Sequence, residues 1–221
     1  MVIFCHGIPG SKPNPDDRGY LGLVEDIVSD GFCCVVFNFR GCGLSSGNID
    51  MRAWFTDLGL VFDKVYNLPG IDTSSIHYIG FSAGGAIASR HACFEKKVQS
   101  LLLMATPYSL SDILPDDAYA LKRHFLELGT IRDKDFPKDI DSWYQGFKEL
   151  NTGQWIPFLS PRPVGIVHGD SDEVVPYEHA GLLYESACLP KKITILDGAA
   201  HQLRKDPRVS GIIRDWLSKV R

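Results

Sequence analysis

The sequence predicts an α/β fold in which helices flank a mostly parallel sheet of about six strands. Six short apolar runs are rich in β-branched and aromatic residues, and their nearly continuous hydrophobicity is typical of strands covered on both faces. Helix-like segments alternate with these runs, which indicates crossover connections. The expected strands are residues 2–4, 32–39, 75–81, 98–105, 163–169 and 192–197. The expected helices are residues 17–30, 51–67, 83–95, 177–188 and 206–220.

One region departs from this alternation and predicts a helical cap insertion at about residues 106–160. Apolar residues recur there at helical spacing, and no strand is indicated. The two groups are Ala118, Leu121, Phe125 and Leu128, then Ile140, Trp143, Tyr144, Phe147 and Leu150. Because ligands of open α/β sheets bind outside the carboxyl ends of the strands, a cap inserted after a strand could form the roof of a pocket. The alternative is that its aromatic side chains only fasten the cap to the body.

Length and charge limit the class of protein. A chain of 221 residues is expected to form one domain over residues 1–221 with a substantial core. The net charge is −4 and the acidic and basic residues are interleaved, so no electrostatic footprint for nucleic acid or an anionic membrane surface is present. A small molecule is therefore the expected partner, and the sequence leaves the oligomeric state open.

Apolar segments and cysteines indicate a cytoplasmic protein. No apolar run approaches the roughly 20 residues of a membrane span, and the start "MVIFCHGIPG" lacks the basic stretch and cleavage site of a signal peptide. No pair of cysteines has C-x-x-C spacing, and five of the six lie in or beside expected core elements, so we expect buried free thiols in a reducing compartment. The cysteines are Cys5, Cys33, Cys34, Cys42, Cys93 and Cys188.

A serine between glycines follows the third expected strand, in the stretch Gly80-Phe81-Ser82-Ala83-Gly84. A sharp strand-to-helix turn with positive φ would thrust the side chain of Ser82 outward, and small neighbours would let the helix start close against the strand. The pattern alone should arise by chance in roughly one chain in fifteen of this length. The expected strand before it and helix after it favour a nucleophile over the alternative, a structural glycine-rich turn.

A serine nucleophile needs a base that is oriented by a carboxylate, and the acid is expected to precede the base in the chain. The loop after the fifth expected strand holds three candidate acids, Asp170, Asp172 and Glu173. Only His179 and His201 follow them, and because His179 falls in an expected helix, His201 is the candidate base. The other histidines precede the acidic cluster: His6, His77, His91, His124 and His168.

These stretches resemble the α/β-hydrolase superfamily, particularly compact serine esterases and catalytic domains similar to prolyl oligopeptidase and dienelactone hydrolase. The resemblance covers nearly the whole chain, because "FCHGIPGS", "FNFRGCGLSSG", "GFSAGG", "PVGIVHGDSDEVVP" and "GAAHQL" occur in the family's order. The family's pattern H-G-x-x-D-x-x-V-P implies that Asp172 is the acid. Asp170 then resembles a turn or capping residue.

The resemblance also implies an oxyanion hole made of two backbone N–H groups, those of Ile8 and Ala83. The residue types agree, because Gly7 permits a close backbone approach and Pro9 has no N–H to donate. The alternative for "HGIPG" is a simple Gly/Pro turn. Two leading strands that are common in larger members are absent before the first expected strand, so the chain is either a minimal form or a fragment.

The glycine-rich stretch "RGCGLSSG" at residues 40–47 raises the alternative of a nicotinamide-binding protein. Its spacing is G-x-G-x-x-x-G and no helix opens directly on it, so the dinucleotide fingerprint is not matched. The stretch resembles the family's loop beside the active site, in which Arg40 would tie loops together. A catalytic Ser45 is the less favoured alternative.

The function that the sequence predicts is hydrolysis of carboxylic esters with small or medium apolar acyl or aryl groups. Ser82, His201 and Asp172 would act as a catalytic triad through an acyl-enzyme, with no cofactor and no metal, because no His/Cys cluster has zinc spacing. Two alternatives within the fold are an aminoacyl-peptidase and a thioesterase, so the substrate could also be a thioester or a short peptide. A third is a catalytically silent binding module.

Overall fold

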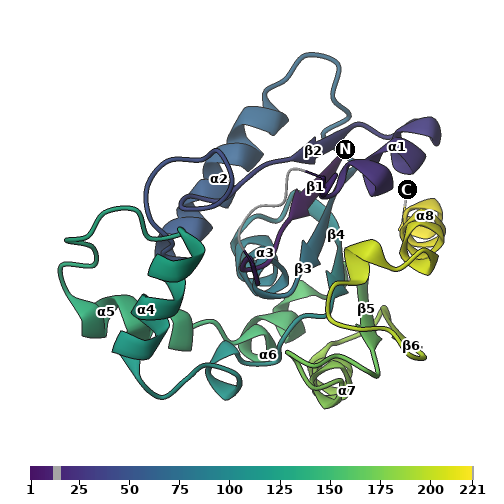
Figure 1. The fold of residues 1–221 in the computed structure, drawn as a ribbon. Helices are drawn as coiled ribbons and strands as arrows, with labels where there is room; N and C mark the ends of the chain where they lie inside the picture. The colour runs from purple at the N-terminus through teal and green to yellow at the C-terminus, as the bar shows by residue number, and fades with distance from the viewer. Residues whose placement is uncertain (12–15, 221) are drawn as a thin grey trace.

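A six-stranded parallel sheet forms the centre of the structure, a computed structural model that describes residues 1–11 and 16–220 (Figure 1). The strands follow the spatial order β2-β1-β3-β4-β5-β6, and each neighbouring pair is parallel. Their bounds are β1 Val2–Cys5, β2 Cys34–Val36, β3 Ile76–Phe81, β4 Val98–Met104, β5 Val164–Gly169 and β6 Lys191–Leu196. The predicted fold class is confirmed.

Helices cover both faces of this sheet, and each of the five predicted outside the insertion is present. The α-helices are α1 Leu21–Ser29, α2 Met51–Tyr66, α3 Ala83–Phe94, α4 Ala118–Leu128, α5 Ile140–Lys148, α6 Thr152–Trp155, α7 Glu178–Ser186 and α8 Arg208–Val220. The short 3₁₀ segments are η1 Leu110–Asp112, η2 Ile156–Leu159 and η3 Leu203–Lys205. The helix predicted from residue 17 begins only at Leu21.

Two apolar cores lie on opposite faces of the sheet, because successive side chains of a strand point to opposite sides. In β1, Val2 and Phe4 join the core beneath α1 and α8, whereas Ile3 and Cys5 join the core shared with α2, α3 and α7. Figure 1 shows α1 and α8 together on one side of the sheet and α2 on the other. Burial on both faces explains the nearly continuous hydrophobicity of the strand sequences.

The strand predicted over residues 32–39 is wrong in its extent, because β2 spans only Cys34–Val36 at the edge of the sheet. The apolar run continues beyond the strand for a different reason. Phe39 leaves the sheet and stacks on Trp54 of α2, with ring centroids 4.4 Å apart. An apolar run indicates burial, and here part of the burial comes from a helix rather than from strand pairing.

The region between β4 and β5 holds the two predicted amphipathic helices, α4 and α5, and also the short segments α6, η1 and η2, which the sequence pattern did not predict. Figure 1 shows α4 and α5 beside α2, away from α8. The aromatic side chains of the insertion fasten it to the body and to itself. Phe125 and Phe147 stack with centroids 5.5 Å apart, Trp143 Nε1 donates to the Ile49 carbonyl at 2.9 Å, and the Tyr144 hydroxyl donates to the Pro115 carbonyl. These four side chains are buried.

The six cysteines are free thiols, but the prediction that they are buried holds for only three of them. Cys5, Cys42 and Cys93 are buried, whereas Cys33 and Cys188 are exposed. Cys33 directly precedes the edge strand β2, which is itself only partly buried. Within the described part of the chain, each helix is too short or too polar to cross a lipid bilayer.

The buried histidine His77 of β3 is expected to make the fold sensitive to acid. It contacts the Ser75 and Ser100 hydroxyls, and burial lowers its pKa from the ordinary 6.5 to about 4. As the pH falls from 6.5 toward 4, the unfolded chain takes up a proton at this residue and the folded chain does not, so the free energy of unfolding decreases. When this effect is complete, the free energy of unfolding is lower by about 3 kcal/mol, and at pH 5 it is lower by about 2 kcal/mol.

Urea unfolding of wild type and His77→Gln at pH 7.5 and pH 5 measures this contribution, because glutamine keeps a polar group and has no titration. The wild type should lose more stability than the variant between the two pH values. Equal losses would show that His77 does not contribute, and that the other buried histidines carry any acid sensitivity.

Candidate active site

Ser82 sits on the sharp turn that the sequence predicts between β3 and α3. Its backbone has φ +52° and ψ −129°, a conformation that L-residues rarely adopt. Such a residue costs about 1–3 kcal/mol and persists where its surroundings impose it. The Ser82 N–H donates to the Met104 carbonyl of β4 at 2.8 Å, and the Gly85 N–H donates to the Ser82 carbonyl at 2.9 Å. These bonds hold the turn against its strain.

Two positions around this turn require glycine, because other backbone atoms lie too close there to leave room for a Cβ. A Cβ on Gly80 would lie 2.4 Å from the Cα of Gly85, and a Cβ on Gly84 would lie 2.2 Å from the carbonyl oxygen of His6. Real Cβ atoms do not approach backbone atoms so closely, so any side chain here would push α3 away from the sheet. The G-x-S-x-G spacing therefore has a steric cause in this fold.

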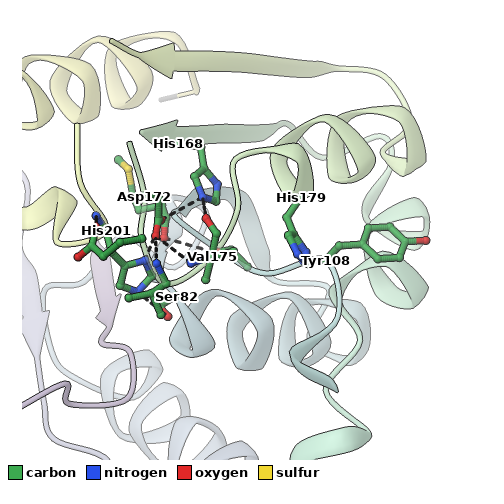
Figure 2. Close-up of polar contacts among 11 residues, drawn as sticks. Ser82, Tyr108, His168, Asp172, Val175, His179 and His201 are labelled. Carbon is green, nitrogen blue, oxygen red and sulfur yellow. Dashed lines mark hydrogen bonds and ion pairs between the residues drawn. The ribbon is translucent and has the colours of Figure 1, made fainter. Parts of the chain in front are cut away.

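Ser82, His201 and Asp172 form a continuous series of hydrogen bonds, although they come from three distant parts of the chain (Figure 2). His201 Nδ1 lies 2.8 Å from Asp172 Oδ2, and His201 Nε2 lies 3.2 Å from Ser82 Oγ. An ionised carboxylate only accepts hydrogen bonds, so Nδ1 carries the proton and Nε2 is free to accept the serine proton. This is the tautomer that a general base for the hydroxyl needs.

Of the three carboxylates that follow β5, only Asp172 contacts the His201 imidazole. Asp170 Oδ1 instead accepts from the Gly198 N–H at 2.7 Å, so it joins its loop to the distant turn after β6. Glu173 Oε2 accepts from the backbone N–H of His201 at 3.3 Å. The geometry thus separates three side chains that the residue pattern by itself left as alternatives.

The Asp172 side chain is fully buried, and each of its two carboxylate oxygens accepts a hydrogen bond. Oδ1 accepts from the N–H groups of Val174 and Val175 at 2.9 and 2.8 Å. Oδ2 accepts from His201, and His168 Nε2 lies 3.1 Å from the same oxygen. Burial raises the pKa of Asp172, but the donors His168, His201 and Val175 outweigh it and hold this pKa well below its usual range. The carboxylate is therefore ionised at neutral pH.

The loop after β1 lies against Ser82. A Cβ on Gly7 would come within 2.7 Å of the Ser82 Cβ. The Phe39 N–H donates to His6 Nε2 at 2.9 Å, so His6 Nδ1 carries the proton and donates to the Gly7 carbonyl at 2.7 Å. In a planar trans peptide the carbonyl and the following N–H point in opposite directions, so the Ile8 N–H points away from the His6 ring.

The glycine-rich loop at residues 40–47 is held by a residue that the sequence pattern did not single out. Arg132, from the insertion, donates to the carbonyls of Ser45 at 2.6 Å and Gly43 at 2.8 Å. The Ser45 hydroxyl donates to the Asn38 carbonyl at 2.6 Å, which is a structural contact. Arg40 pairs with Asp57 of α2 and so ties the start of the loop to that helix, and not to a second loop as predicted.

An apolar cavity of about 260 Å³ lies elsewhere, between α8 and the first halves of β5 and β6. Ser82, Asp172 and His201 do not line it. Among the described residues, no group of three His, Cys, Asp or Glu side chains could hold a metal ion.

The fold and the site define a class of protein: a parallel α/β sheet with a serine on a strained turn after a central strand, and a histidine and an aspartate beyond two later strands. Comparison with known families agrees with this class. The model of the family described as "alpha/beta hydrolase fold" matches residues 1–143. The chain belongs to this family.

Known proteins that resemble the chain are distant in sequence. It is 22% identical over 203 residues to the uncharacterized protein YfhR of Escherichia coli K12, covering 90% of this chain and 62% of that protein. It is 25% identical over 240 residues to the lysophosphatidylserine lipase ABHD12 of Macaca fascicularis, covering 99% of this chain and 56% of that protein. The chain thus spans less than two thirds of the length of these two relatives.

A solved structure with a similar fold is the monoacylglycerol lipase of Paleococcus ferrophilus. The two structures superpose with a TM-score of 0.73 at 19% identity, covering 100% of this chain and 94% of the lipase. At this identity the similarity shows the fold alone.

Proposed function

We propose that this protein is a serine hydrolase that cleaves carboxylic esters of small or medium apolar acyl or aryl groups. The observation that carries the proposal is the hydrogen-bond series from the Ser82 hydroxyl through His201 to Asp172. An alcohol, an imidazole in the accepting tautomer and an ionised carboxylate in this order are the groups that acyl transfer through a serine requires.

In the first half of the reaction, His201 Nε2 takes the proton of the Ser82 hydroxyl while Oγ forms a bond to the ester carbonyl carbon. The carbonyl π electrons move to oxygen and give a tetrahedral oxyanion. The buried Asp172 carboxylate stabilises the imidazolium that has formed. The imidazolium then gives its proton to the leaving alkoxide, the carbon–oxygen bond to that alkoxide breaks, and an acyl-Ser82 ester remains.

Two backbone N–H groups are the proposed donors to the oxyanion. Ala83 is the first residue of α3, and the first N–H groups of a helix have no acceptor within it. The Ile8 N–H belongs to the peptide whose carbonyl is held by His6, next to Ser82. Removal of one such donor typically costs about 10²–10³-fold in turnover.

In the second half, a water molecule replaces the alcohol. His201 takes a proton from the water as its oxygen bonds to the acyl carbon, and the same two N–H groups hold the second oxyanion. Collapse of this intermediate breaks the bond to Oγ, His201 returns its proton to Ser82, and the carboxylic acid leaves. The cycle consumes one water and needs no further reactant.

The choice of an ester as substrate is supported by two observations. Two of the similar proteins are named as lipases, namely ABHD12 and the monoacylglycerol lipase of Paleococcus ferrophilus. The net charge of −4 with interleaved signs favours neutral substrates over polyanions. A panel of p-nitrophenyl esters of increasing acyl length, an acyl thioester and an aminoacyl amide would separate esterase from thioesterase and peptidase. The proposal requires the highest kcat/KM on an ester.

Covalent labelling by a fluorophosphonate tests the proposed nucleophile directly. We expect the wild type to be labelled stoichiometrically on Ser82 and Ser82→Ala to remain unlabelled, because only an activated serine attacks phosphorus at a useful rate. Intact-mass spectrometry followed by peptide mapping measures both the extent and the position of labelling.

The matched control is Ser45→Ala, which removes a hydroxyl from the glycine-rich loop and should label like the wild type. Absence of labelling in a folded wild-type protein would contradict the proposal and favour a catalytically silent binding module. Labelling that is lost in Ser45→Ala and kept in Ser82→Ala would assign the nucleophile to the other serine.

A further inference from the structure

A second imidazole, that of His168, contacts the carboxylate of Asp172 on the side opposite its backbone donors (Figure 2). His168 lies in β5, four residues before Asp172, and its side chain is fully buried. Its Nε2 is 3.1 Å from Asp172 Oδ2 and 2.9 Å from the Val175 carbonyl oxygen. Two imidazoles, His168 and His201, thus converge on one carboxylate oxygen.

The position of the proton on His168 follows from its partners. A carbonyl oxygen only accepts hydrogen bonds, so the bond to Val175 requires a proton on Nε2. Asp172 Oδ2 lies 3.1 Å from the same nitrogen, and His168 is one of the groups that lower the pKa of this carboxylate. His168 Nδ1 is buried and has no hydrogen-bond partner among the described residues, so a second proton there would be buried without an acceptor. His168 is therefore a neutral donor.

The contact gives the Asp172 carboxylate a fourth partner. Val174 and Val175 occupy Oδ1, and His201 and His168 occupy Oδ2. The His168 ring is carried by the interior strand β5, whereas Asp172 lies in the loop beyond it. A buried ring on a strand thus anchors a carboxylate on a loop, and the carboxylate in turn orients His201.

We propose that His168 is a positioning residue that acts through Asp172: it holds the carboxylate in line with His201 and shares the negative charge of Oδ2. Its effect on turnover rests on the proposed function, whereas its contact with Asp172 does not. Without the His168 donor, more of the charge on Oδ2 would act on His201, which favours the imidazolium. The carboxylate would also lose the anchor that fixes its rotamer.

The test compares His168→Gln with His168→Leu. The glutamine Nε2 can reach the position of the imidazole Nε2 and still donate, whereas leucine fills the space without a donor. We expect His168→Leu to lower kcat on a p-nitrophenyl ester about ten-fold or more with little change in KM, because a misplaced group slows the chemical step. His168→Gln should restore most of the lost kcat.

The pH profile of kcat/KM supplies a readout that loss of packing would not move. Its acid limb reports protonation of the base in the free enzyme, and in His168→Leu it should move to higher pH, because more of the charge of Asp172 acts on the imidazolium. The titratable groups around this pair are Asp172, His201, Glu173 and His179, and neither variant replaces any of these residues. His168→Gln should keep the wild-type acid limb.

The matched control is His77→Leu, which removes another fully buried imidazole, from β3, that contacts Ser75 and Ser100 and not Asp172. It should lose stability without a shift of the acid limb. The proposal is overturned if folded His168→Leu keeps both kcat and the acid limb of the wild type. It is also overturned if the glutamine and leucine variants lose the same activity in proportion to their loss of stability.

Nitrogen-15 NMR of histidine-labelled wild type supplies a readout that needs neither turnover nor a folded variant. We expect the His168 proton to be on Nε2, and a proton on Nδ1 alone would overturn the proposal. If the fluorophosphonate fails to label Ser82, the proposed function fails, but the NMR result still tests whether the His168 proton is on Nε2, the nitrogen that faces Asp172.

Discussion

His201→Ala is expected to lower kcat for ester hydrolysis by about 10⁶-fold, as much as Ser82→Ala, and the double variant should lose no more than either single one. The reason is that the two side chains act as one unit. Without the imidazole at 3.2 Å from Oγ, the hydroxyl keeps its proton, and without the hydroxyl the imidazole has no nucleophile to activate. Steady-state turnover of a p-nitrophenyl ester measures the effect, with the double variant as background.

A suitable control for this experiment is His124→Ala, which removes an exposed histidine from α4 and should leave kcat within about two-fold of the wild type. Circular dichroism should show that each variant is folded. Strictly multiplicative losses in the double variant would contradict a single Ser82–His201 unit. Retention of more than about a hundredth of the activity in His201→Ala would show that another group is the base.

Asp172→Asn is expected to lower kcat by about 10⁴-fold while the fold is kept. The amide oxygen should face the N–H groups of Val174 and Val175, which require an acceptor. The amide NH₂ then faces His201 Nδ1, so the imidazole is driven to carry its proton on Nε2, toward Ser82. In that tautomer His201 has no lone pair for the hydroxyl proton, and the NH₂ also opposes the donor of His168.

The matched control for this variant is Asp170→Asn, two residues earlier in the same loop. Asparagine keeps the oxygen that accepts from the Gly198 N–H, and Asp170 does not contact the His201 imidazole. Its kcat should stay within about three-fold of the wild type. A similar loss in both variants, or a loss confined to Asp170→Asn, would contradict the assignment of Asp172 as the acid.

Local patterns predicted much of the fold because each strand and helix carries its own periodicity. β3 and β5 are buried on both faces and read as apolar runs, and α3 follows the small residues around Ser82. The pattern failed where burial came from a distant element. Phe39 belongs to an apolar run because it stacks on Trp54, so the run overstated the length of β2.

The short segments of the insertion were missed for a related reason. α6 has only four residues, which is too few for helical periodicity to register. Its N-cap, Asn151, is held by an antiparallel bridge to Ser109, a contact across more than forty residues that no local window contains. The same insertion supplies Arg132, whose role depends on the carbonyls of a loop that lies far away in the chain.

By itself the sequence determined the elements and the candidate chemistry: a parallel sheet, a serine on the turn between β3 and α3, and a histidine that follows the last strand. Each of these features depends on residues within a few positions of one another, so the local sequence is enough to predict it. The resemblance already implied Asp172, but only the tertiary structure shows that its carboxylate meets His201 and that His168 joins it. Contact by Asp170, Asp172 or Glu173 depends on where a loop directs each side chain. Side-chain direction is set by packing and hydrogen bonds from distant strands, which a pattern of neighbours does not contain.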